Sequence, residues 1–230
     1  MKQAAEVSEE LGVEIIGGHT EITSAVNKPV IVSTAVGRGP KWSSRQAENM
    51  KPGDYILMTK QAGLEGTAII AGDYRDELAG FLTEEEFREA EEMMRQISVV
   101  KEGVIAGRIG TTGMHDITEG GVLGAVWEMC EIAKTGAEVW VDKVPVAEVT
   151  KKICDRFDID YLRLISSGSM MIMVHPDVKD RMEKELRDAG IPVACIGRIV
   201  EREAGVCMVV NGEKIVIAPP ASDEIYRVLA

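Results

Sequence analysis

The chain has 230 residues, enough for one large domain or two small ones, and with 45% apolar and 28% charged residues it can bury a substantial core. Its formal net charge of −12 argues against nonspecific binding to nucleic acid or to an anionic membrane surface, because both need basic patches. The four cysteines form no Cys-x-x-Cys pair, which argues against a zinc knuckle or a redox dithiol and predicts buried, reduced thiols: Cys130, Cys154, Cys195 and Cys207.

The first 50 residues are predicted to contain one short helix and two strands. Apolar spacing over residues 1–11 favours an amphipathic helix that Gly12 ends. Residues 13–16 and 29–37 are rich in β-branched side chains and predict strands, with a polar loop over residues 19–28 between them.

Turn residues and charges gather between Gly39-Pro40 and Lys51-Pro52-Gly53, the best candidate for a domain boundary. We therefore expect one domain over residues 1–50 and a second over residues 51–230.

Predicted strands and helices alternate through the second part of the chain. A strand is predicted over residues 54–59 and a helix over residues 64–71. The capping box Thr83-x-x-Glu86 begins a further helix, whose apolar face is expected to hold Phe87, Ala90, Met94 and Ile97. A helix after residues 114–118 should end at Gly136, before a strand at 139–141, and its apolar positions are Leu123, Val126, Trp127 and Cys130.

The last third is predicted to contain a helix between two strands, followed by a hairpin. Strands at 169–174 and 193–199 flank a helix that Asp177 caps and Gly190 ends, with one face formed by Val178, Met182, Leu186 and Ala189. Asn211-Gly212 predicts a hairpin between residues 206–210 and 214–217. The alternation is typical of an α+β fold or a mixed α/β sheet.

The first chemically capable cluster is Gly17-Gly18-His19-Thr20-Glu21, at the end of a predicted strand. Paired glycines let the backbone approach a ligand and present amides to phosphate oxygens. Glu21 could hold Mg²⁺, Thr20 could bond a phosphate, and His19 could donate to one or carry a proton. A double glycine is a weak signal, and taken alone the cluster is more simply interpreted as a tight loop after a strand.

The second cluster runs from Met114 to Gly121 and carries His115, Asp116, Thr118 and Glu119 before Gly120-Gly121 at a helix start. Helix N-termini favour anions, and a nearby carboxylate would recruit the metal that neutralises them. The structural alternative is that Thr118 or Asp116 is an N-cap and Glu119 a first-turn acid.

Two further segments are weaker signals. Ser166, Ser167 and Gly168 belong to a small polar loop that could line a nucleotide cleft, although loops in general have this composition. Residues 63–67 could face a ligand or form an ordinary helix start, and His175 before Pro176 is expected to be structural.

Together, these segments resemble the aminoimidazole ribonucleotide synthetase superfamily over essentially the whole chain. In order, they read GGHTEIT, TAVGRGP, KPGD, GLEGTAIIA, MHDITEGGVLGAVWE, RLISSGSMMI and GRIVE. Within the superfamily, the HypE-like branch of hydrogenase maturation is the most similar.

The resemblance implies a C-terminal mixed-sheet domain over residues 51–230 and the remnant of an N-terminal ATP-binding and dimerisation domain over residues 1–50. It implies ATP and Mg²⁺ as cofactors and a nucleotide cleft. The catalytic positions would be His19, Glu21 and Asp116, with Glu21 and Asp116 as metal ligands. The cofactor-binding positions would be Gly17, Gly18, Thr20, Thr118, Glu119, Gly120, Gly121, Ser166, Ser167 and Gly168.

The chemistry implied by the resemblance is activation of a carbonyl or amide-type oxygen by phosphoryl transfer from ATP. Two departures bear on it: residues 1–230 do not include the family's glycine-rich, aspartate-bearing ATP segment, and residues 225–230 carry no cysteine like the one in the HypE tail. The competing interpretation is a noncatalytic binding or scaffold module of the same fold. No apolar run approaches the roughly 20 residues that span a bilayer, so we expect a cytoplasmic protein. The resemblance also implies a homodimer and a hydrogenase-maturation partner.

Overall fold

The computed structural model describes residues 2–39 and 47–228, and the chain divides into two compact units, residues 1–39 and 40–230. Each unit is described by itself. Of the predicted boundary region, residues 40–46 lie outside the described residues, and the boundary at residue 51 stays a prediction. None of the helices in the described ranges has the length and apolar character needed to cross a membrane.

The first unit contains the predicted amphipathic helix, α1 (Lys2–Leu11). The predicted strands at 13–16 and 29–37 are wrong, because the chain forms no strand in either segment. Side chains such as Ile16, Ile31 and Val32 are between 85% and 89% exposed. β-Branched alternation supplies strand propensity, but a strand also needs a hydrogen-bonded neighbour and a surface on which to pack.

The second unit is built on a seven-stranded sheet, in the order β2-β4-β1-β5-β3-β6-β7. Neighbouring strands are antiparallel except β3 and β6, which are parallel, and this confirms the predicted mixed sheet. The strands are β1 (Tyr55–Thr59), β2 (Gly113–Asp116), β3 (Gly136–Trp140), β4 (Met170–Val174), β5 (Val193–Val200), β6 (Val206–Val210) and β7 (Glu213–Val216).

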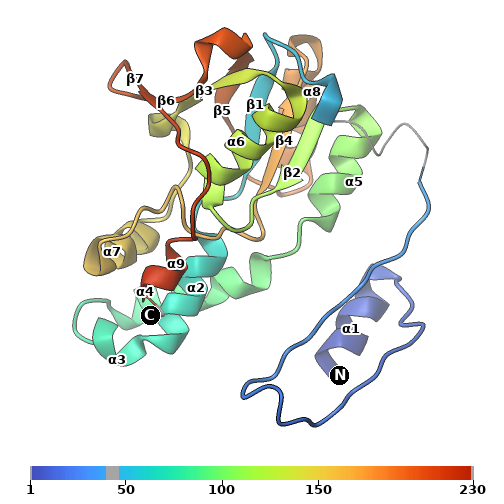
Figure 1. Ribbon diagram of the computed structural model, residues 1–230, viewed down its shortest axis with the longest axis vertical. Helices are drawn as coiled ribbons and strands as arrows, with labels where there is room; N and C mark the ends of the chain where they lie inside the picture. Colours follow the sequence, from blue (N-terminus) through green and yellow to red (C-terminus); the bar gives the residue numbers. More distant parts are fainter. Residues whose placement is uncertain (1, 40–46, 229–230) are drawn as a thin grey trace. The chain divides into compact units, whose positions relative to one another are not determined.

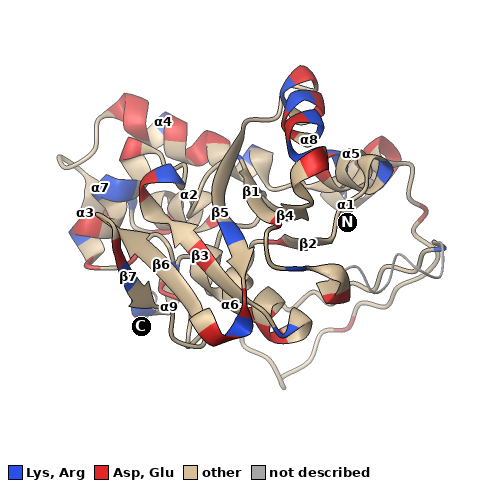
Figure 2. Ribbon diagram, turned by 90° about the horizontal axis from the view of Figure 1, so that it is seen from above, with Lys and Arg blue, Asp and Glu red and all other residues tan. Residues whose placement is uncertain are grey.

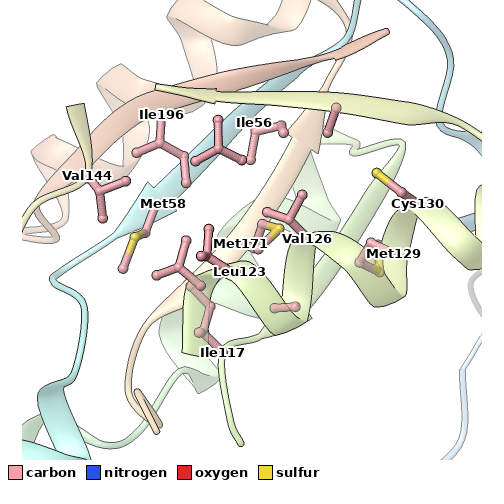
Figure 3. Close-up of a cluster of buried hydrophobic side chains, with 14 of the residues drawn as sticks. Ile56, Met58, Ile117, Leu123, Val126, Met129, Cys130, Val144, Met171 and Ile196 are labelled. Atoms are coloured by element: carbon pink, nitrogen blue, oxygen red, sulfur yellow. The ribbon is translucent and has the colours of Figure 1, made fainter. Parts of the chain in front are cut away.

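Helices cover both faces of the central strands (Figure 1). On one face, α6 (Gly121–Ala133) packs against alternate residues of β1, including Ile56 and Met58 (Figure 3). On the other face, Leu57 packs in a cluster with residues of α5 (Val100–Ile109) and α8 (Pro176–Asp188). Each fully buried aliphatic side chain in these clusters stabilises the fold by about 1.5–3 kcal/mol.

A separate helical layer forms the third apolar cluster of this unit. Its helices are α2 (Leu64–Asp73), α3 (Arg75–Leu78), α4 (Glu84–Met93), α7 (Glu148–Phe157) and α9 (Ile225–Val228). The predicted capping box at Thr83 and Glu86 is confirmed. The predicted apolar face is wrong at its end, because α4 stops at Met93, which is buried, while Met94 and Ile97 are exposed beyond it.

Three other boundaries test the sequence signals. Helix α6 ends before Lys134, whose φ of 58° supplies the left-handed cap expected of a glycine, so Gly136 instead begins β3. The predicted cap Asp177 is also wrong, because its backbone N–H donates to the side chain of His175, the true N-cap of α8 and thus structural as expected. The hairpin is confirmed, with positive φ at both Asn211 and Gly212.

Charged side chains gather on the helices of the second unit. Acidic residues dominate α4, which carries six glutamates and one arginine, whereas the two signs alternate along α8 (Figure 2). The exposed face of α4 therefore offers no basic patch for a polyanion.

Candidate functional site

Three strand ends of the second unit meet at one end of the sheet. Because β4 is antiparallel to both β1 and β2, the start of β4 lies beside the ends of the other two strands. We call the segments gathered here the loop cluster, defined as residues 59–63, 116–121, 165–169 and Asp223. Two predicted motifs, residues 116–121 and 166–168, are thus brought together, and Ile117 N–H donates to the Ser169 carbonyl at 2.9 Å.

The loop at residues 165–169 is held by its own hydroxyl groups. Ser166 Oγ accepts from Gly63 N–H at 2.6 Å and donates to the Leu164 carbonyl at 2.8 Å. Gly168 has a φ of 106°, and a Cβ there would lie 2.6 Å from the Gln96 carbonyl oxygen. Ser166 and Gly168 are buried, so Ser167, which is half-buried, is the predicted member that keeps some exposure.

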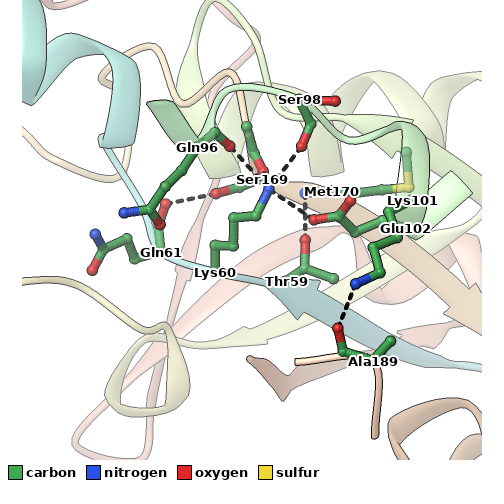
Figure 4. Close-up of polar contacts among 11 residues, drawn as sticks. Thr59, Lys60, Gln61, Gln96, Ser98, Lys101, Glu102, Ser169, Met170 and Ala189 are labelled. Atoms are coloured by element: carbon green, nitrogen blue, oxygen red, sulfur yellow. Dashed lines mark hydrogen bonds and ion pairs between the residues drawn. The ribbon is translucent and has the colours of Figure 1, made fainter. Parts of the chain in front are cut away.

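Lys60 holds this loop against its neighbours (Figure 4). Its Nζ donates to the carbonyls of Gln96, Ser98 and Gly168 at 2.8–2.9 Å, which uses all three ammonium hydrogens. Glu102 Oε1, 2.7 Å from the same nitrogen, supplies the opposite charge from a side chain only 2% exposed. Sequence reasoning missed this pair. A lysine after a strand and a glutamate inside a helix are both common, and Lys60 and Glu102 lie 42 positions apart in the sequence.

The motif at residues 116–121 presents two carboxylates to solvent. Asp116, the last residue of β2, and Glu119 are both exposed, while Thr118 is half-buried. His115 Nε2 lies 3.6 Å from Glu128 Oε2 on α6. Gly121 has a φ of 60°, and a Cβ there would lie 2.6 Å from the Leu162 carbonyl oxygen, so close packing explains this glycine.

At the start of α6, the backbone is bound by Asp223, a residue that the sequence analysis did not single out. Neither Thr118 nor Asp116 caps the helix. Gly120 is the N-cap residue, and it makes no side-chain capping hydrogen bond. Its N–H instead donates to Asp223 Oδ2 at 2.7 Å. Burial raises the pKa of Asp223 above its usual range and Glu119 adds to the rise, while three backbone amides oppose it.

The remaining predicted site residues lie in the first unit. Gly17, Gly18, His19, Thr20 and Glu21 are exposed and belong to no helix or strand. His19 Nε2 lies 3.6 Å from Glu21 Oε2, a contact between two exposed side chains. That these residues share a cleft with Asp116 and Glu119 stays a prediction.

The donor groups fit a metal only in part. Within residues 2–39 and 47–228, no group of three or more His, Cys, Asp or Glu side chains is arranged to hold a metal ion. Mg²⁺ that accompanies a nucleotide is commonly bound through one or two carboxylates plus phosphate oxygens, and exposed Asp116 meets that smaller requirement.

The cysteines are free thiols, as expected, although Cys195 is half-buried rather than buried. Burial raises the pKa of Cys130 to about 11 and that of Cys154 to about 12.

Comparison with known sequences identifies a family and several relatives. A family model described as "AIR synthase related protein, C-terminal domain" matches residues 51–210. A protein of Methanocaldococcus jannaschii named for hydrogenase expression and formation is 26% identical over 230 residues, covering 99% of this chain and 66% of its own length. Carbamoyl dehydratase HypE of Rhizobium leguminosarum bv. viciae is 23% identical over 202 residues, covering 84% of this chain and 54% of its own length. The chain thus spans about half to two thirds of these relatives.

Solved structures share the fold at 20–23% identity. Escherichia coli HypE, a hydrogenase maturation protein, has a TM-score of 0.75 and 23% identity, covering 97% of this chain and 68% of its own. HypE in complex with ATP has a TM-score of 0.58 and 20% identity, covering 78% of this chain and 54% of its own. A chain of a HypE–HypF complex has a TM-score of 0.55 and 20% identity, covering 76% of this chain and 55% of its own.

Proposed function

Because the chain belongs to the AIR synthase related protein family through the C-terminal domain matched at residues 51–210, we propose that it is part of a HypE-like, ATP-dependent enzyme of hydrogenase maturation. The proposed reaction is activation of a carbonyl or amide-type oxygen by phosphoryl transfer. The family match carries the proposal, and the relatives named carbamoyl dehydratase HypE and the ATP complex of HypE support it.

The proposed roles of the side chains follow from their exposure. Asp116 is an exposed carboxylate at a strand end, with His115 Nδ1 3.7 Å from its Oδ1, and it is suited to hold the Mg²⁺ that screens phosphate charge. Thr118 and Glu119 follow it in the same segment and would orient the nucleotide or its water shell. Glu21 would provide a second metal ligand, and His19 a proton carrier or phosphate donor, if the predicted shared cleft exists.

The decisive experiment measures ATP turnover by the natural full-length protein. Asp116→Asn and Glu21→Gln should each lower kcat/KM on the order of 100-fold, because they remove charge that the transition state needs. Stability should change by less than about 0.5 kcal/mol, since both side chains are exposed. Asp155→Asn, an exposed change on α7, is the control and should leave turnover unchanged.

Unchanged turnover in Asp116→Asn would show that this carboxylate has no part in the reaction. Loss of ATP turnover in Asp116→Asn but not in Glu21→Gln would reject the shared cleft and leave the loop cluster as the proposed site.

A noncatalytic scaffold is the second candidate, and one observation favours it. The Gly120 N–H and the Ser166 hydroxyl, both expected to face a ligand, are used in contacts within the chain. The scaffold hypothesis expects Asp116→Asn to support hydrogenase maturation as well as the wild type does. It also expects a maturation partner to bind without ATP, and the HypE–HypF complex indicates the kind of partner. Homodimerisation is part of either proposal, and sedimentation velocity of the full-length protein tests it.

A further inference from the structure

The segment after β7 crosses the second unit and is anchored at both ends. At its start, buried Ile217 donates its N–H to the Val206 carbonyl at 2.8 Å. At its end, Ile225 and Val228 are buried in the helical layer. Figure 1 shows this segment passing the beginning of α6 on its way to α9. We call residues 217–228 the C-terminal strap.

Asp223, in the middle of the strap, is only 2% exposed, and its carboxylate accepts three backbone hydrogen bonds. Oδ2 accepts from Gly120 N–H at 2.7 Å. Oδ1 accepts from Ile165 N–H at 3.2 Å and from Ile225 N–H at 2.8 Å. The two oxygens therefore join the start of α6, the loop that begins at Ile165, and the strap itself.

Two of the three donors, Gly120 N–H and Ile165 N–H, belong to segments of the loop cluster. Gly120 lies within the motif 116–121, and Ile165 directly precedes Ser166 of the motif 166–168, so one carboxylate fixes the backbone at both predicted motifs of the loop cluster. A carboxylate accepts from several N–H groups without offering a donor in return. The isosteric amide of asparagine would turn one oxygen into an NH₂ group facing N–H donors, so the bridge depends on the charge type as well as on the shape.

We propose that Asp223 is a positioning residue, which sets residues 116–121 and 165–169 in the register that the candidate site requires. Asp223 acts through the backbone and touches no substrate. The effect on catalysis rests on the proposed function, whereas the effect on the two loops does not.

The test compares Asp223→Asn with Glu224→Gln in the full-length protein. Glu224 lies on the same strap, but its carboxylate meets Asp160 N–H and Arg227 rather than the loop cluster. Asp223→Asn should raise the amide hydrogen-exchange rates of Gly120 and Ile165 at least about 10-fold and lower kcat/KM for ATP about 10-fold. Glu224→Gln should leave both amide rates and kcat/KM near the wild-type values.

Equal effects of the two variants, or a loss of kcat/KM that only follows the loss of folded protein, would overturn the positioning role. If Asp223→Asn does not fold, the wild-type protein still decides the matter. Nuclear magnetic resonance couplings across the hydrogen bonds should connect Asp223 Cγ with the amides of both Gly120 and Ile165, and the absence of either coupling contradicts the bridge. Failure of ATP turnover in the wild type, with both couplings present, would reject the proposed function and leave the bridge in place.

Discussion

Replacing Lys60 by methionine tests how strongly the loop cluster is held together. The lysine side chain is 14% exposed and its partner Glu102 is 2% exposed, so the ion pair is almost free of solvent screening. Methionine keeps most of the length and the apolar stem but removes the charge and three donors. The carbonyls of Gln96, Ser98 and Gly168 and the carboxylate of Glu102 would then lose their common partner.

The expected loss of stability is large, because breaking a buried ion pair from one side leaves the other charge uncompensated. Such changes cost about 3–5 kcal/mol. For a chain of this size, that corresponds to a fall in Tm of roughly 6–20 °C. Adding Glu102→Leu to Lys60→Met should restore part of the loss, since apolar replacement of both partners is often close to neutral.

Urea unfolding, followed by circular dichroism, measures these differences, and Lys101→Met is the matched control. Lys101 is exposed, and its Nζ donates one hydrogen bond, 2.6 Å long, to the Ala189 carbonyl (Figure 4). Losing this hydrogen bond should cost about 0–1 kcal/mol of stability. A cost below about 1 kcal/mol for Lys60→Met, or a cost equal to that of Lys101→Met, would refute the reasoning.

Two further predictions concern backbone strain and pH. Gly121→Ala should cost about 3 kcal/mol or more, because it adds a close contact with the Leu162 carbonyl to the left-handed strain; Gly190→Ala, with similar φ and open space, should cost about 1–2 kcal/mol in the same urea assay. Because burial raises the pKa of Cys130 from 9.0 to about 11 and that of Cys154 to about 12, the unfolded chain loses these protons first as pH rises. The free energy of unfolding should therefore be unaffected by the two thiols below pH 9 and should fall between about pH 9 and 12, by up to about 1.4 kcal/mol per pH unit and thiol. Alanine at either position should make this slope shallower, and an unchanged slope in both variants would contradict the assignment.

Local signals predicted the elements whose stability is local. The reciprocal bonds of Thr83 and Glu86 and the paired positive φ values at Asn211 and Gly212 arise within a few residues, so their sequence patterns suffice. Residues 29–37 show the opposite case. They are rich in β-branched side chains, yet a strand depends on neighbours that composition cannot supply.

The candidate site was predictable only where its residues form a motif. Residues 116–121 and 166–168 were found by composition and do lie together, since Ile117 bonds to Ser169. Asp223 was missed, because an isolated aspartate after two prolines carries no periodic or spacing signal. Its role depends on amides roughly 60 and 100 positions away, and such partners become visible only once the chain has folded.

The place of β1 between β4 and β5 affects how the chain folds while it is being synthesised. Leu57 pairs with Ile172 on one side and with Cys195 on the other, so both partners leave the ribosome roughly 115 to 138 residues after it. At about 5–20 residues per second, an apolar strand with both edges open must wait roughly 6–28 seconds for its neighbours. During that time it is a template for pairing with other nascent chains. The yield of folded protein should therefore depend on elongation rate and on chaperones more than the final stability suggests.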